Sequence, residues 1–175
     1  LIQFIIICIF YVIFKIIGVK LSSFLSGKLF EIIGPIFRSK QIVDNNIKRA
    51  FPDYNSRELN KIKSSMWNNY GRVFAEYLYM KNFRNGNLSK NISIEGEDVL
   101  LNIKDQNQKV VFISGHFSNF ELMAMQIDKI GIKIGAIYRP LNNIFLNKFM
   151  ERIRKKYICN NCLLYTSDAA DDNVG

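Results

Sequence analysis

His116 is the only histidine in this chain of 175 residues, and the carboxylate Glu121 follows it five positions later. An apolar run over 110–113 leads into the histidine, and a helix-like run over 121–125 leads out of it. An imidazole placed just before a helix can take a proton from a substrate hydroxyl, and a carboxylate in the first turn can reach back to hold its tautomer. No serine or cysteine nucleophile is needed when the substrate hydroxyl itself attacks. The pair therefore predicts general-base catalysis.

The alternative is an ordinary surface or core histidine. With 15 acidic residues among 175, one of them can fall five positions after a histidine by chance. The residues around the histidine favour a site. Gly115 lets the backbone approach closely beside it, and Ser118 or Asn119 can cap the following helix. A capped helix start presents N–H groups and a partial positive charge, which can stabilise a developing oxyanion.

Further blocks occur in order along the chain. They are Asn-Ile-Lys-Arg-Ala-Phe-Pro-Asp at 46–53, Gly-Arg-Val-Phe-Ala-Glu at 71–76, Ile-Glu-Gly at 94–96 and Ile-Tyr-Arg-Pro at 137–140. Together with the His-x4-Glu motif at 116–121, they resemble the bacterial lipid A biosynthesis lauroyl/myristoyl acyltransferases of the glycerolipid acyltransferase superfamily. Several ordered matches are more specific than the histidine motif alone.

The resemblance implies acyl transfer from acyl–acyl carrier protein to a hydroxyl of a lipid A precursor, in lipopolysaccharide biosynthesis at the cytoplasmic face of the bacterial inner membrane. His116 is then the general base, and Glu121 orients it. Arg139 is the candidate contact for an acceptor phosphate, since its planar fork suits phosphate; a solvated or structural arginine is the alternative. Gly115 and Asn119 are further candidate substrate-binding residues, with helix capping as the alternative for Asn119. The resemblance implies no cofactor and no metal.

Two other functions stay open at this point. A glycerol-phosphate or lysophospholipid acyltransferase would use the same histidine with a smaller acceptor. A non-catalytic, membrane-anchored protein would bind lipid or carrier protein through a basic surface. The intact pair of His116 and Glu121 argues against the second function.

The chain is basic, with a net charge of +9, and 49% of its residues are hydrophobic. The last segment, 162–175, carries three Asp and no Lys or Arg, so the excess of positive charge lies before it. A basic surface beside an apolar N-terminus favours anionic lipid or an acidic carrier protein as partner. Nucleic acid is the competing partner; scattered basic residues and the lack of a zinc-finger or RNA-binding signature argue against it.

The apolar segment 1–19 predicts a membrane anchor helix, because its many Leu, Ile, Val and Phe residues favour insertion. A cleaved signal peptide is the alternative, but Lys15, Lys20 and Lys28 lie within and after the apolar stretch rather than before it. We therefore expect an uncleaved anchor with its basic flank in the cytoplasm. The segment 21–37 predicts an amphipathic helix, lying either on the bilayer or in the core.

The rest of the chain predicts an incomplete mixed α/β sheet domain after these membrane-associated helices. Asn55 and Glu58 form a capping box, and apolar residues at three-four spacing from Leu59 to Met80 predict a long helix. Strands are then predicted at 92–94, 110–114 and 133–138, alternating with helices at 97–104, 119–130 and 142–156. His116 would follow the carboxyl end of a strand, where open α/β sheets bind ligands.

Three segments are expected: an anchor at 1–19, the N-terminal part of an acyltransferase domain at 20–161, and a tail at 162–175. The tail resembles a translated sequencing-library adapter, so we leave it out of the functional argument. Cys159 and Cys162 have metal or redox spacing, but no second pair accompanies them. The chain begins at Leu1 and ends before the later blocks of the family, which predicts an incomplete and inactive fragment.

Overall fold

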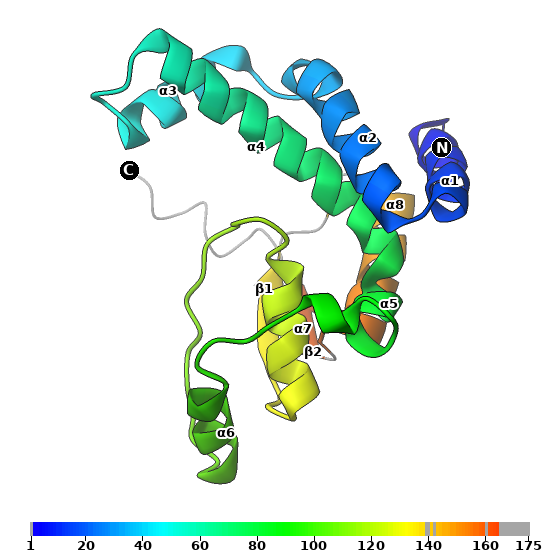
Figure 1. The fold of residues 1–175 in the computed structure, drawn as a ribbon, viewed down its shortest axis with the longest axis vertical. Helices are drawn as coiled ribbons and strands as arrows, with labels where there is room; N and C mark the ends of the chain where they lie inside the picture. Colours follow the sequence, from blue (N-terminus) through cyan, green and yellow to red (C-terminus); the bar gives the residue numbers. More distant parts are fainter. Residues whose placement is uncertain (1, 139–140, 142, 160, 165–175) are drawn as a thin grey trace. The chain divides into compact units, whose positions relative to one another are not determined.

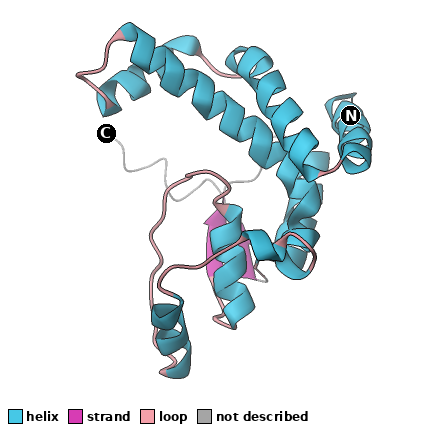
Figure 2. Ribbon diagram, viewed as in Figure 1, coloured by secondary structure: helices cyan, strands magenta, loops and turns pink. Residues whose placement is uncertain are grey.

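The computed structural model describes residues 2–138, 141, 143–159 and 161–164, and over these residues the chain is mainly helical (Figures 1 and 2). Its contacts group into two compact units. One unit is Ile7–Tyr79, and the other combines Leu1–Ile6 with Met80–Gly175. Each unit has its own buried residues, such as Ala75 in the first and Met125 in the second.

In the first unit, helix α2 (Val19–Ile33) packs along helix α4 (Ser56–Glu76) (Figure 1). The other elements are the part of α1 (Ile2–Ile17) from Ile7 onward, a 3-10 turn (Gly34–Ile36), α3 (Lys40–Ala50) and a second 3-10 turn (Tyr77–Tyr79). The close packing of α2 on α4 requires Gly71, because a Cβ at this position would lie 2.3 Å from the carbonyl oxygen of Ser26. A side chain there would push the two helices apart.

The start of α4 confirms the predicted capping box. The Asn55 side chain accepts hydrogen bonds from the backbone N–H groups of Arg57 (2.9 Å) and Glu58 (3.1 Å). In return, the Glu58 carboxylate accepts a hydrogen bond from the backbone N–H of Asn55 at 2.8 Å. The side chains thus satisfy N–H groups that the first turn of a helix leaves unpaired.

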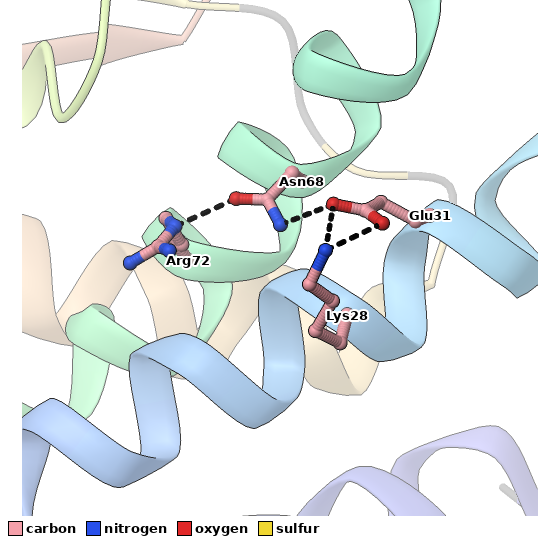
Figure 3. Close-up of polar contacts among 4 residues, drawn as sticks. All are labelled: Lys28, Glu31, Asn68 and Arg72. Carbon is pink, nitrogen blue, oxygen red and sulfur yellow. Dashed lines mark hydrogen bonds and ion pairs between the residues drawn. The ribbon is translucent and has the colours of Figure 1, made fainter.

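A chain of polar contacts crosses from α2 to α4 (Figure 3). Lys28 donates to both carboxylate oxygens of Glu31, at 3.1 and 3.0 Å. Asn68 donates to Glu31 at 2.6 Å and accepts from Arg72 at 2.6 Å. Hydrogen bonds from Lys28 and Asn68 lower the pKa of Glu31. These contacts tie the two helices together beside an interface whose buried residues are small.

The second unit follows the order α5 (Met80–Asn85), a 3-10 turn (Ser89–Asn91), α6 (Glu97–Asp105), α7 (Glu121–Ile130), β1 (Gly135–Tyr138), α8 (Ile144–Ile153), a π-helical turn (Arg154–Ile158) and β2 (Asn161–Leu164). Strands β1 and β2 pair in parallel, with Gly135 opposite Asn161 and Tyr138 opposite Leu164. Helices α6, α7 and α8 confirm the helices predicted in this half, and β1 confirms the last predicted strand.

The predicted α/β sheet domain is nevertheless wrong for this structure. The strands found in the described residues are the two four-residue strands β1 and β2. The segments 92–94 and 110–114 form no strand. Val111 and Ile113 in the second of them are 87% and 94% exposed. A strand needs a neighbouring strand to pair its backbone groups, whereas a helix pairs its own, so β-forming residues alone do not make a sheet.

The predicted membrane helix over 1–19 is also wrong in this structure. Helix α1 has 16 residues and ends at Ile17; Gly18 follows with φ of +81°, and α2 starts at Val19. A helix needs about 20 apolar residues to cross the hydrocarbon core. Among the residues described here, we find no helix that is both long enough and apolar enough to span a membrane.

Candidate active site

The segment before α7 places His116 at an exposed position. Its imidazole ring meets the ring of Phe120 edge-on, with the centroids 4.2 Å apart and an interplanar angle of 69°. Phe120 also holds the N-cap position of α7 and supplies no side-chain cap. The N-cap position thus lies one residue after Asn119, and capping by Ser118 or Asn119 stays a prediction.

Two backbone features bend this segment tightly. A Cβ on Gly115 would lie 2.5 Å from the ring of Phe117, so glycine allows the phenylalanine to fold back over the main chain. Ser118 has φ of +45°, a left-handed conformation that costs free energy for a residue with a side chain. The turn between His116 and α7 is therefore tight at two positions.

Glu121, the first residue of α7, is only 6% exposed. Its Oε1 atom accepts two hydrogen bonds from Arg154, at 3.0 Å from Nε and 2.5 Å from Nη2. Arg154 begins the π-helical turn after α8 and is itself largely buried. A buried carboxylate needs such a partner, because the charge has lost most of its hydration.

Sequence reasoning did not single out Arg154. It lies 33 residues from Glu121, so no local spacing links the two residues. The one available signal was the basic character of the segment from Lys148 to Lys156, which does not tell which cation turns inward.

A second ion pair holds the same elements together. Arg84 of α5 donates to Asp128 of α7 at 2.6 Å and to the carbonyl oxygen of Tyr157 at 3.2 Å. It therefore links α7 to the turn that carries Arg154. This contact thus helps to hold both α7, which carries Glu121, and the turn that carries Arg154.

His116, Glu121 and Arg154 line one cavity of about 490 Å³. Gly115 also lines it. The remaining wall is largely apolar and includes Met123, Ala124, Ile137, Leu141 and Ile158. An imidazole and a buried ion pair in an apolar cavity can bind a hydroxyl and move its proton.

A second cavity of about 650 Å³ adjoins the first and shares Met123, Ala124, Ala136 and Ile137 with it. Its other apolar lining residues are Val110, Val111, Phe112, Ile127, Ile132 and Ile134. The first cavity thus has a polar end, and the second continues beside it as a mainly apolar space that Gln108, Lys109 and Lys133 also line.

The other predicted site residues are placed as follows. Asn119 is half-buried before α7, and its backbone carbonyl accepts a hydrogen bond from Leu122 N–H at 3.1 Å. It is not among the described residues that line the cavity. Arg139 lies outside the described residues, so its role stays a prediction. Of the cysteine pair, Cys159 is buried at the cavity, and no cluster of three metal-ligand residues is found in the described part of the chain.

Comparison with protein families gives one match. The model of the bacterial lipid A biosynthesis acyltransferases covers residues 1–160, which is most of the chain. Comparison with curated proteins and with solved structures gives no match. Because the family model extends over the motif, the cavity and both helical units, the chain belongs to the bacterial lipid A biosynthesis acyltransferase family and is an acyltransferase.

Proposed function

We propose that this acyltransferase moves a fatty acyl group from acyl–acyl carrier protein to a hydroxyl of a lipid A precursor. The family supports an acyltransferase of lipid A synthesis. The observation that carries the finer proposal is that His116, Glu121 and Arg154 line one cavity with an apolar continuation. We place the reaction at the cytoplasmic face of the inner membrane, where a carrier protein and a lipid acceptor can meet.

In the proposed reaction, His116 takes the proton of the acceptor hydroxyl as its oxygen attacks the thioester carbonyl. A carbon–oxygen bond forms, and the tetrahedral intermediate then breaks its carbon–sulfur bond. The leaving thiolate receives the proton from the imidazolium, which returns His116 to its neutral form. The step needs no external cofactor, because the thioester supplies the driving force.

Glu121 and Arg154 have a supporting role in this proposal. Glu121 orients the imidazole and stabilises the imidazolium once the acceptor is bound, while Arg154 holds the carboxylate in place. Catalytic hydrogen bonds are often long before the substrate binds, so the exposed position of His116 is compatible with this role.

The proposed substrates follow from the residues that line the two cavities and from the net charge of the chain. The apolar cavity that adjoins the site accommodates the acyl chain of the donor. The net charge of +9 favours an acidic carrier protein and a phosphorylated acceptor. Arg139 contacts an acceptor phosphate in this proposal, with Gly115 and Asn119 on the acceptor side of the site.

The test is transfer by the purified full-length protein from acyl–acyl carrier protein to a lipid A precursor, with the product identified by mass spectrometry. His116→Ala should lower turnover by about 10²–10⁴-fold, the scale of a general base. Lys129→Ala is the matched control and should retain turnover, because Lys129 is an exposed residue of α7 that lines neither of these two cavities. Near-normal turnover by His116→Ala would refute the mechanism. Transfer to a lysophospholipid or glycerol phosphate, with none to the lipid A precursor, would refute the substrate.

A further inference from the structure

The outer side of α8 and of the turn after it carries a concentration of positive charge. Five basic residues and one acidic residue lie between Lys148 and Lys156. Four of the five basic side chains are exposed, and the fifth, Arg154, turns inward to Glu121. We name the exposed set the α8 basic face: Lys148, Arg152, Lys155 and Lys156.

The spacing places these side chains on one face. Lys148 and Arg152 are four residues apart in α8, so they are neighbours on one helix face about 6 Å apart along the axis, and Lys156 follows in the π-helical turn. These residues border one surface depression together with Glu151 and Lys155. Glu151 pairs with Lys155 at 2.7 Å. Within the described residues, no ion pair is found for the other three cations.

The face stands directly beside the site. Arg152 and Lys155 flank Arg154 in sequence, and Arg154 lines the cavity with His116. The backbone of the same turn is held by Arg84 through the carbonyl oxygen of Tyr157 at 3.2 Å. A partner bound at the α8 basic face would therefore be held within a few residues of the cavity.

We infer that the α8 basic face docks the acidic carrier protein that delivers the acyl thioester to the cavity. The inference rests on the proposed function, because it names the surface through which the proposed donor is recognised. A cluster of cations around one depression complements the carboxylates on the surface of an acidic protein. Docking there brings the thioester to the site that Arg154 helps to form.

The face fits an acidic protein better than a bilayer. Residues that dock on a membrane surface combine basic side chains with exposed apolar ones that enter the lipid. On this segment the interleaved apolar residues Phe149, Met150 and Ile153 are half-buried against the protein. The exposed apolar residues of α8, Ile144 and Phe145, precede the face.

The test compares two donors in the full-length protein. Acyl–acyl carrier protein needs a docking face, whereas acyl-pantetheine carries the same thioester without the protein. The variant with Lys148→Glu, Arg152→Glu and Lys156→Glu should lower kcat/KM for the carrier-bound donor by about 30-fold or more, with loss of its salt dependence. The rate with acyl-pantetheine should stay within about twofold, because the site itself is unchanged.

A matched charge reversal at α3, with Lys40→Glu, Lys48→Glu and Arg49→Glu, controls for net charge, since these three residues are exposed. It should leave kcat/KM for the carrier-bound donor within about threefold. An equal loss in both triple variants, an equal loss with both donors, or no loss at all would overturn the inference. The inference would also fail if the α8 triple variant lost binding to anionic vesicles while its KM for the carrier-bound donor stayed unchanged. That result would assign the face to lipid.

Direct titration with acylated carrier protein separates the inference from the proposed function. Wild-type protein that binds the carrier, while the α8 triple variant does not, supports the docking face. If the same wild-type protein transfers no acyl group to a lipid A precursor, the proposed function fails and the docking face stands.

Discussion

Arg154 donates two hydrogen bonds to the Oε1 atom of Glu121 from a position 33 residues further along the chain. The pair joins the first residue of α7 to the turn after α8, and both side chains are largely buried. The acid of the His-x4-Glu motif is therefore held by a cation that the motif does not contain. This relationship makes the geometry of the site depend on the packing of α7 against the turn at 154–158.

Arg154→Ala should destabilise the protein by about 3–5 kcal/mol, because it leaves the Glu121 carboxylate buried without its counter-charge. Urea denaturation followed by circular dichroism measures the change. Arg152→Ala, at an exposed position two residues earlier, should change stability by less than about 0.5 kcal/mol. Adding Glu121→Gln to Arg154→Ala should recover part of the loss. A double variant less stable than Arg154→Ala would contradict the pairing.

His116→Ala combined with Glu121→Gln should be little slower than His116→Ala alone, because the two side chains act as one unit. Single-turnover rates with acyl–acyl carrier protein give the comparison, and substitution by glutamine preserves the shape of the buried side chain. If the rate loss of the double variant equalled the product of the losses in the two single variants, Glu121 would act independently of the imidazole.

Gly115→Ala should slow the reaction, because the new Cβ would lie 2.5 Å from the ring of Phe117 and shift the segment that carries His116. The stability cost should be small, about 1 kcal/mol or less, since Phe117 is exposed and its ring can move. Phe117→Ala added to Gly115→Ala should restore turnover. Failure of this rescue would mean that the backbone of Gly115 itself contacts a substrate.

Gly71→Ala should destabilise the first unit by about 1–3 kcal/mol, because the added methyl group meets the backbone oxygen of Ser26, which cannot move alone. Thermal unfolding measures the loss. Ser65→Ala on the same helix is exposed and serves as the control, with an expected change below about 0.5 kcal/mol. Equal stability of the two variants would disprove the close packing of α2 on α4.

Arg139→Lys should raise the acceptor KM more than it lowers kcat, because the charge is kept and the bidentate fork is lost. Arg139→Ala should raise the acceptor KM further, because the loss of a charged hydrogen bond weakens acceptor binding by about 1.5–3 kcal/mol. Steady-state kinetics with each substrate varied in turn gives both constants. A change confined to the donor KM would assign Arg139 to the carrier-protein surface, and lower thermal stability alone would make it structural.

Features that depend on neighbouring residues could be predicted from the order of amino acids alone. The capping box of Asn55 and Glu58, the long helix after it and the helices α6 to α8 rely on contacts within a few positions, so local pattern predicts them. The family also followed from sequence, because its blocks are short and ordered, and the family match over 1–160 confirms it.

The choice of packing and pairing partners for each segment depended instead on contacts made in the folded protein. The apolar residues at 110–114 suit a strand, yet in the described part of the chain they pair with none, and β1 pairs with β2 instead. The apolar leader suits one long helix, yet Gly18 with φ of +81° divides it into α1 and α2. Arg154 was one of several cations in its segment until folding placed it against Glu121. Each outcome depends on contacts between residues far apart in the chain, and local propensity carries no information about them.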